Sequence, residues 1–492
     1  MAEQHLSATE LVRRESEEGR LPLLAGARVW AKNMFFLWTT FAFGAATWAL
    51  LTGGFIGFYV DFPRGAGAFF AGHASSFMLL IVGLVIPCAK YGVDAIDYAK
   101  SQFGVYGSQV VLLALITIVL GWGGVLLFLA QDAVVNIWNE YVASDPISNR
   151  WLPGLFGLAI LASCWAFVSR GPRAFIGVAK VAGPAIILLV LAMFFTLIAK
   201  EGLDIFTQNP APSDPPLAKD YSYSLMAEWA FGYGLSWWTA AGAYSRLSSG
   251  PRKAWWIIFL SWSVMQVCIV LIAILAGLAS GQTDPILWMV PLLGVGGGLV
   301  ALAFVLLANW TSIAGILYIG AVACQQLPVF RRVPWWALTA LMASPGVYLV
   351  FWPEYFKAHY ATFLYYNAIL IAPSATIHAV DYYLLRKQRI DPRALYSFKR
   401  GDKYWYWGGF NWVAIGVCAG CFFFYVWLLN PITTESNSPF QYITATLPTI
   451  ALAALAYYVL MRFIAIPVFN KGSYPAGRVV PRLEEAVPSV EM

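Results

Sequence analysis

The segment Ala42-Phe43-Gly44-Ala45-Ala46 interrupts the first long apolar stretch of this 492-residue chain. A second segment, Ala230-Phe231-Gly232-Tyr233-Gly234, interrupts the sixth apolar stretch with the same Ala-Phe-Gly tripeptide. Glycine lacks a Cβ atom and tolerates an unwound helix, whose freed carbonyls and amides can hold a ligand. Glycine also serves close helix packing, so each segment alone is ambiguous. The pairing of the two interruptions predicts a transporter built from two five-helix halves, with its binding site between them.

The composition around these segments is that of a membrane protein. Hydrophobic residues make up 60% of the chain and charged residues only 11%, which excludes a set of soluble domains. Apolar stretches long enough to cross a bilayer, about 20 residues each, recur along the chain. There are twelve of them, at 34–59, 70–94, 107–138, 151–169, 174–199, 223–246, 254–279, 294–324, 334–353, 360–385, 408–430 and 440–467. The sequence therefore predicts an all-α integral membrane protein with 12 transmembrane helices, and a candidate short helix at 285–293.

The basic residues indicate the orientation of these spans. With the N-terminus inside, only five of the 31 Lys and Arg residues fall in external loops, namely Arg64, Arg150, Lys200, Lys219 and Lys357. Basic residues concentrate in cytoplasmic loops, so this distribution predicts that both termini are cytoplasmic. The N-terminal segment carries Glu, Ser and several Arg and does not resemble a cleavable signal peptide. We expect a multi-pass protein of the cell (inner) membrane.

Enzymatic and metal chemistry leave no recognisable pattern in the sequence. The six cysteines lie within apolar stretches without paired-ligand spacing, and the four histidines are scattered. No nucleophile-and-base group or phosphate-binding glycine loop stands out. We therefore predict no catalytic residue, no cofactor and no nucleic-acid partner. A membrane-embedded enzyme acting on a lipid or prenyl chain stays as the alternative from another class.

Several short motifs carry a resemblance to a known family. The chain reads Asp381-Tyr382-Tyr383-Leu384, then a basic run, then Leu395-Tyr396, then Asn411-Trp412. Further matches are the stretch 100–108, the partial match Ala243-Tyr244-Ser245-Arg246 (Ala243 replaces an Asp), and the prolines Pro184 and Pro373. In this order the motifs resemble the nucleobase:cation symporter-1 family, over about residues 30–430.

The resemblance implies a fold and an activity. The fold is a five-plus-five inverted repeat like that of leucine-type transporters, followed by two peripheral helices. The implied divisions are a cytoplasmic tail at 1–30, a first repeat at 31–200, an inverted second repeat at 201–390, a loop and two helices at 391–467, and a cytoplasmic tail at 468–492. The implied activity is symport of a small heterocycle such as a nucleobase, a hydantoin or a vitamin precursor, driven by Na⁺ or H⁺. A same-fold carrier of an amine or an amino acid is the alternative within transport.

A candidate ion site lies in the eighth span. Ala308, Thr311 and Ser312 stand at i, i+3 and i+4 and share one helical face. The resemblance implies that the Ala308 carbonyl and the two hydroxyls bind Na⁺ together with the carbonyls of Phe41 and Gly44. The alternative is that both hydroxyls bond back to their own helix, as Ser and Thr in membrane helices often do.

A candidate substrate site centres on Trp122, which matches the tryptophan on which the ligand of this family stacks. Three polar positions of the hydantoin-type member are occupied here by Ala45, Leu126 and Leu317, and a second stacking tryptophan falls on Gly234. We therefore expect a more apolar pocket, with hydantoin or a simple nucleobase a doubtful ligand. The aromatic or polar groups that could read the ligand instead are Tyr233, Trp237, Trp238, Asn309, Tyr365 and Asn367.

Acidic residues inside spans are costly and deserve a functional hypothesis. Glu228 lies one turn before Gly232, and we predict for it a role as a proton site, a partner of a substrate cation or a gate, with an interfacial carboxylate as the alternative. His378 and Asp381 lie near the inner end of the tenth span, where we expect them to serve the structure or the inner gate.

Overall fold

The computed structural model describes residues 12, 16–23, 28, 33–44, 47–142, 147, 150–171, 174–210 and 219–474. Within these ranges the secondary structure is helical, apart from two isolated β-bridges. The main α-helices are α2 (Asn33–Gly44), α3 (Thr47–Tyr59), α4 (Phe62–Leu80), α5 (Ile86–Tyr91), α6 (Ala95–Phe103), α7 (Gly107–Tyr141), α8 (Trp151–Val168), α9 (Ala174–Glu201), α10 (Lys219–Ser236), α11 (Trp238–Ser245), α12 (Pro251–Ile258), α13 (Gln266–Ser280), α14 (Pro285–Cys324), α15 (Trp335–Leu349), α16 (Glu354–Ala358), α17 (Tyr360–Val380), α18 (Trp412–Leu428), α19 (Phe440–Ile443), α20 (Thr446–Leu460) and α21 (Ile466–Phe469). Four π-helical stretches, Ile81–Val85, Phe259–Met265, Asp381–Leu385 and Met461–Ala465, continue α4, α12, α17 and α20.

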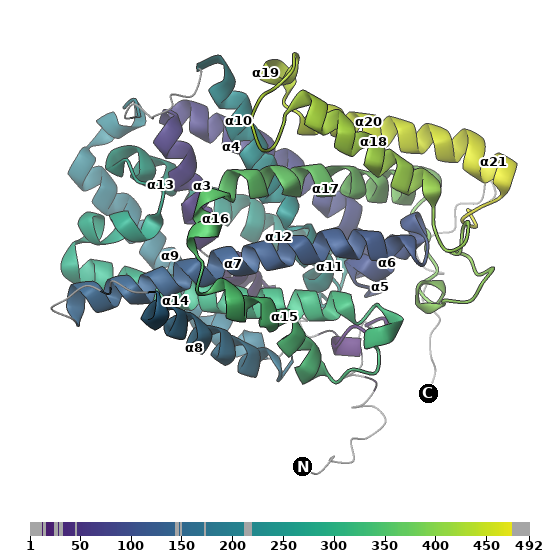
Figure 1. Cartoon of the computed structure of the whole chain (residues 1–492), viewed down its shortest axis with the longest axis horizontal. Coiled ribbons are helices and arrows are strands. Elements are labelled where there is room, and N and C mark those ends of the chain that lie inside the picture. The colour runs from purple at the N-terminus through teal and green to yellow at the C-terminus, as the bar shows by residue number, and fades with distance from the viewer. Residues whose placement is uncertain are drawn as a thin grey trace, which may run out of the picture.

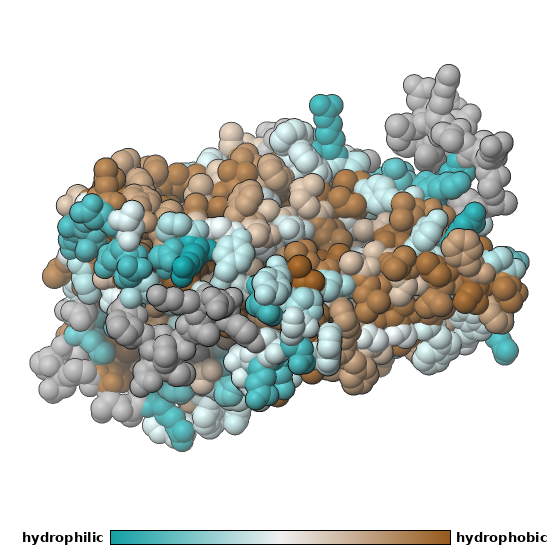
Figure 2. Space-filling model, turned by 90° about the horizontal axis from the view of Figure 1, so that it is seen from above, coloured by the Kyte–Doolittle hydropathy of each residue, from teal (hydrophilic) through white to brown (hydrophobic). Residues whose placement is uncertain are grey.

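The helices have the length and surface of membrane spans. Eight helices of the described ranges are apolar and long enough to cross a bilayer, and the bent pair Phe36–Gly44 and Ala49–Tyr59 would make nine. Large apolar side chains face outward, such as Leu188, Phe195 and Phe423, which are 68%, 65% and 71% exposed. Figure 2 shows hydrophobic side chains over much of the face seen from above. Each of the twelve predicted stretches falls on a helix or helix pair, and the exact number of spans stays a prediction.

Helix starts follow from local sequence signals. Asp61 and Asp284 each accept a backbone N–H with the side chain at the start of a helix, α4 and α14 respectively, and a proline follows within the first turn. Because Asp61 caps α4, the second span begins at Phe62, eight residues before the predicted start. Asn411 of the Asn-Trp motif caps α18 by accepting from the Val413 N–H.

The helix interfaces recur in pairs. The most extensive interfaces join α3 with α13, α10 with α4, and α7 with α14. In an inverted repeat, spans one to five correspond to spans six to ten. The α3–α13 interface (spans one and seven) then corresponds to the α4–α10 interface (spans two and six). The α7–α14 interface (spans three and eight) corresponds to itself. The contact of α2 with α9 similarly corresponds to that of α10 with α17. This is the packing expected of two inverted five-helix repeats.

The two predicted interruptions have different outcomes. Helix α2 ends at Gly44 and α3 begins at Thr47, with a 44° bend between their axes, so the first span is broken where the sequence indicated. The prediction for the sixth span was wrong in position, because α10 continues through Gly232 and Gly234 to Ser236 and the break falls at Trp237. At Gly232 an added Cβ would lie 2.0 Å from the Leu364 carbonyl oxygen, so this glycine permits close packing against α17.

The candidate short helix at 285–293 is also present. Gly294 has φ 72° and ψ 174°, a non-helical conformation that separates this first part of α14 from the long remainder. Only glycine adopts such a backbone without strain.

Helices α18 and α20 lie at one edge of the bundle, where they contact α17 and each other (Figure 1). The helices α2 and α10 lie inside, and each contacts helices of both halves. The interior between the two breaks is therefore the place where residues from both repeats meet.

Candidate functional site

The hydroxyl of Ser312 joins the eighth span to the break in the first span. Its Oγ donates to the Phe43 carbonyl at 2.8 Å and to the Ala308 carbonyl at 2.9 Å. The Thr311 hydroxyl also donates to the Ala308 carbonyl, at 2.8 Å. Both hydroxyls thus bond back to their own helix, and Ser312 in addition reaches α2. Two hydroxyls and two carbonyls form an all-oxygen group, which is the donor type that a hard cation prefers.

The α2 carbonyl that accepts from Ser312 is that of Phe43, which lies between the predicted ligands Phe41 and Gly44 in the sequence. The Gly44 carbonyl accepts a hydrogen bond from Gln266 Nε2, whereas Phe43 provides the oxygen next to Ser312. An added Cβ at Gly44 would lie 2.5 Å from Gln266 Nε2, so the close approach of Gln266 requires glycine at this position. Phe41 is buried two residues before Phe43, and the role of its carbonyl stays a prediction.

Trp122 lies in a buried aromatic group drawn from three spans. Its ring makes edge-to-face contacts with Tyr233 at 6.1 Å, Tyr360 at 6.1 Å and Phe363 at 5.3 Å between centroids. The Tyr360 hydroxyl is 2.7 Å from the Thr52 hydroxyl of α3. Trp122 and Tyr233, both predicted as substrate-site residues, are therefore neighbours.

A second aromatic group adjoins the two breaks. Trp237, at the break of the sixth span, lies 4.4 Å from Trp262 and 5.3 Å from Phe43 between ring centroids. Trp262 Nε1 donates to the Thr40 carbonyl at 2.8 Å, and the Trp262 carbonyl is 2.9 Å from His73 Nε2. The two groups meet because the His73 ring is 5.4 Å from that of Tyr233.

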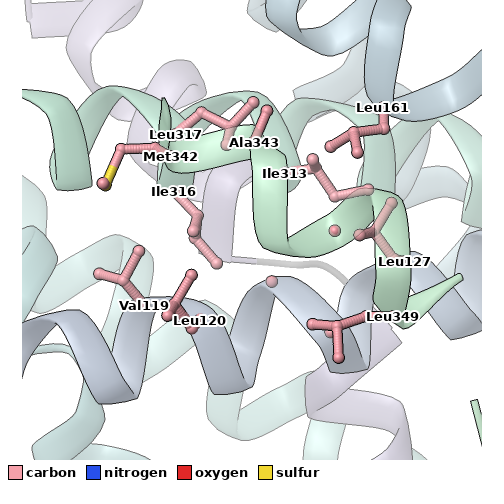
Figure 3. Close-up of a pocket in the computed structure, with 13 residues that line it drawn as sticks. Val119, Leu120, Leu127, Leu161, Ile313, Ile316, Leu317, Met342, Ala343 and Leu349 are labelled. Atoms are coloured by element: carbon pink, nitrogen blue, oxygen red, sulfur yellow. The ribbon is translucent and has the colours of Figure 1, made fainter. Parts of the chain in front are cut away.

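The positions where the chain departs from the hydantoin-type pattern lie in different places. Leu126 is fully buried in the core. Leu317 lines an apolar cavity of about 20 Å³ between α7, α8, α14 and α15, together with Ile313, Leu127 and Met342 (Figure 3). Such a volume holds about one water molecule, so this cavity is too small for a heterocycle. Ala45 lies outside the described residues.

Gly234 has no room for a side chain. An added Cβ there would lie 1.8 Å from the Ser76 Oγ and 3.3 Å from His73 Nδ1. A stacking tryptophan at this position would require α4 and α10 to move apart. Tyr233 is next to Gly234 in the chain and Trp237 follows three residues later, and both rings are buried.

Glu228 is buried among the peripheral helices. Its carboxylate accepts hydrogen bonds from the Tyr425 hydroxyl (2.8 Å), the backbone N–H groups of Ala445 (2.6 Å) and Thr446 (2.7 Å), and the Thr446 hydroxyl (2.7 Å). These groups belong to α18 and the start of α20. Four donors converge on this carboxylate at the start of α20. This geometry favours an anchoring role, and the proton or gate role stays a prediction.

Asp381 forms a second buried charged group near the end of the tenth span. Its carboxylate accepts from Arg386 Nε at 2.6 Å and from the hydroxyls of Tyr457 at 3.0 Å and Tyr474 at 2.5 Å. Arg386 also donates to the carbonyl of Ser101 at 2.6 Å. This network joins α17, α20, the segment after α21 and α6.

Sequence reasoning missed three central residues, His73, Trp262 and Gln266. All three are completely buried, and His73 and Gln266 are polar residues in the apolar second and seventh spans. An isolated polar residue inside a membrane span is itself a signal of function, so His73 and Gln266 were recognisable. The proximity of Trp262 to the break in α2 was not, because it depends on how the seventh span packs.

Known proteins resemble this chain in sequence and fold. A family model described as permease for cytosine/purines, uracil, thiamine and allantoin matches residues 25–460. The hydantoin permease of Microbacterium maritypicum is 34% identical over 147 residues, a segment that spans 28% of this chain and 28% of that relative. The structure of Mhp1, a nucleobase-cation-symport-1 family transporter, in a closed conformation with bromovinylhydantoin bound gives a TM-score of 0.73 at 20% identity and covers 91% of this chain and 95% of that one.

Two further structures share the fold. The inward-facing conformation of Mhp1 gives a TM-score of 0.70 at 16% identity, over 94% of this chain and 95% of that one. A Na⁺-coupled sialic acid symporter in a substrate-bound outward-open state gives 0.59 at 10% identity, over 91% and 95%. These similarities confirm the predicted inverted-repeat membrane fold.

Proposed function

Because the chain belongs to the family of permeases for cytosine/purines, uracil, thiamine and allantoin, we propose that it is a secondary active transporter that symports a small heterocyclic solute with a cation. The observation that carries the proposal is the Ser312 hydroxyl, which contacts carbonyls of both the eighth span and the broken first span. A binding site between two such elements is the arrangement used for alternating access. The relatives and structural neighbours are transporters, and this agrees with the expectation that the chain is not an enzyme.

We propose that the coupling ion is Na⁺, held by the Ala308 and Phe43 carbonyls and the Thr311 and Ser312 hydroxyls. Because these oxygens come from α2 and α14, an ion among them would link two helices that the transport cycle separates. The ion therefore stabilises the state in which the helices are together. Solute and ion then favour one conformation jointly, which is the thermodynamic basis of coupling.

The solute site lies beside Trp122, Tyr233 and Trp237. Flat aromatic faces suit a planar ring. The protein lies in the cell membrane with both termini cytoplasmic, and its two five-helix units, 31–200 and 201–390, move relative to each other during transport. For Glu228 we propose an anchoring role, with the predicted proton or gate role as the alternative.

The test measures thermal stabilisation of the detergent-purified protein by cytosine, uracil, allantoin and hydantoin, each in Na⁺ and in K⁺ at matched ionic strength. We expect at least one compound to raise the melting temperature more in Na⁺ than in K⁺. Ser312→Ala should weaken the Na⁺ effect about tenfold in apparent affinity, since it removes one oxygen ligand.

Ser261→Ala is the matched control. Ser261 is also buried and its hydroxyl donates to its own helix, to the Ile257 carbonyl at 2.7 Å. It should leave the Na⁺ effect unchanged. Equal stabilisation in both salts would remove the case for Na⁺ and leave H⁺. Failure of every compound, together with no uptake into proteoliposomes, would refute the solute class.

A further inference from the structure

Gln266 reaches the break of the first span from the seventh span. It follows directly after the π-helical stretch Phe259–Met265, and its side chain is completely buried. Trp262 and Gln266, four residues apart, both direct donors at the end of α2: Trp262 Nε1 at the Thr40 carbonyl and Gln266 Nε2 at the Gly44 carbonyl. π-Helical stretches inside helices occur frequently at functional sites, where they re-aim side chains.

The other end of the same amide reaches the sixth span. Gln266 Oε1 accepts from the Tyr233 hydroxyl at 3.3 Å, which is long for a bond between two oxygens. The Tyr233 ring in turn lies edge-on to Trp122, with 82° between the ring planes. One amide group thus connects a freed carbonyl at the first break to a hydroxyl beside the stacking surface.

We propose that Gln266 is a specificity-determining residue, whose amide binds the edge of a planar ring that carries an N–H next to a C=O. The Nε2 group donates to the ring carbonyl and Oε1 accepts from the ring N–H. In the structure the Gly44 carbonyl and the Tyr233 hydroxyl occupy these two positions. The inference rests on the proposed function and deepens it, because it assigns to Gln266 the selection among such rings.

The proposal accounts for the lack of polar side chains at three predicted positions of the pocket. Positions 45, 126 and 317 carry no polar side chain, which by sequence indicated an apolar ligand. Gln266 supplies an amide from a span that does not contain any of those positions. A side-chain amide presents an N–H donor beside a carbonyl acceptor, which is complementary to the edge of a ring amide or ureide. Both its nitrogen and its oxygen therefore have a partner when the ring is bound.

The proposal predicts selectivity for parent rings over rings methylated on the ring nitrogen. A ring methylated on that nitrogen cannot donate to Oε1, and it leaves the buried oxygen without a partner. We expect wild-type protein to prefer hydantoin or uracil over the corresponding N-methyl compounds by about ten- to a hundredfold in affinity.

The experiment compares binding of hydantoin, uracil and their N-methyl derivatives by the full-length protein, measured by thermal shift and by competition for uptake into proteoliposomes. Gln266→Met has a similar volume and no amide, and Gln266→Glu keeps the shape but has no N–H donor. We expect both variants to lose affinity for the parent rings while affinity for the methylated rings changes little, so the preference falls to about threefold or less.

The matched control is Gln131→Met. Gln131 is a buried glutamine of α7 that packs against α8 at Gly157. It should leave the preference unchanged. The melting temperature of each variant without ligand reports whether it is folded.

The outcomes separate the inference from the function on which it rests. If Gln266→Met weakens parent and methylated rings by the same factor, Gln266 has only a structural role and the inference is wrong while transport stands. If wild-type protein transports a ring but does not distinguish it from its methylated forms, the inference is likewise wrong. If wild-type protein binds none of these rings, the inference and the solute class both fail.

Discussion

The centre of the molecule and the attachment of its peripheral helices are built from different interactions. Between the two breaks, the contacts are aromatic rings at 4.4 to 6.1 Å and hydrogen bonds between neutral groups. At the attachment of α18 and α20, two buried carboxylates, Glu228 and Asp381, accept hydrogen bonds from charged and hydroxyl donors. They lie toward opposite ends of α20, at Thr446 and Tyr457.

The difference agrees with the proposed transport cycle, in which the centre moves while the peripheral helices stay anchored. Neutral hydrogen bonds and aromatic contacts are individually weak, about 1 kcal/mol each, so they can be exchanged for contacts with a ligand. A buried carboxylate cannot leave its partners without a large penalty. Charge therefore fixes the peripheral helices, while the centre, where substrate and ion are proposed to bind, stays exchangeable.

The largest loss of stability is expected when the Arg386 cation of the Asp381 network is removed. Arg386→Met leaves a buried carboxylate without its ion-pair partner, and we expect a loss of about 3–5 kcal/mol in stability. The melting temperature in detergent measures the effect. Arg386→Lys keeps the charge but not the second donor to the Ser101 carbonyl, so it should fall between wild type and Arg386→Met. A wild-type melting temperature for Arg386→Met would contradict an anchoring role.

A smaller effect is expected at the other anchor. Glu228→Gln removes the charge but keeps one acceptor oxygen, and we expect a loss of about 1.5–3 kcal/mol, the value of a hydrogen bond to a charged group. Uptake per folded molecule should stay near the wild-type value, because the partners of Glu228 are Tyr425, Ala445 and Thr446. Unchanged stability with abolished uptake would instead support the proton or gate role that the sequence suggested.

The smallest effect is expected at an exposed ion pair. Lys403 and Asp391 form a salt bridge in the loop after the tenth span, with side chains 53% and 34% exposed. Burial raises the pKa of Asp391, but the hydrogen bond and charge of Lys403 outweigh it, so the pKa is lowered overall. The pair therefore stabilises the fold at pH values above the ordinary Asp pKa, and this contribution is lost as the pH falls below it.

Lys403→Met should cost less than about 1 kcal/mol at neutral pH, because exposed ion pairs are screened by water and salt. The difference in melting temperature from wild type should shrink in 1 M salt. A destabilisation as large as that of Arg386→Met would show that burial does not decide the strength of these anchors.

Local sequence signals were sufficient for much of the fold. The apolar stretches predicted the helices because a bilayer demands about 20 apolar residues per span and satisfied backbone groups. The bend between α2 and α3 falls at the segment 42–46 that the sequence indicated. The Ser312 face was recognisable because residues at i and i+4 share one side of a helix.

Packing between distant segments decided the rest. Gly232 and Gly234 looked like a break, but the carbonyl of Leu364 and the hydroxyl of Ser76 occupy the space beside them. The hydrogen-bond donors of Glu228 belong to α18 and the start of α20, 197 to 218 residues away in the chain. Gln266 and the break at Gly44 are separated by 222 residues and meet only in the folded protein. The sequence determined where helices form, because that depends on neighbours a few residues apart, whereas partners for buried polar groups come from remote spans and only the tertiary structure selects them.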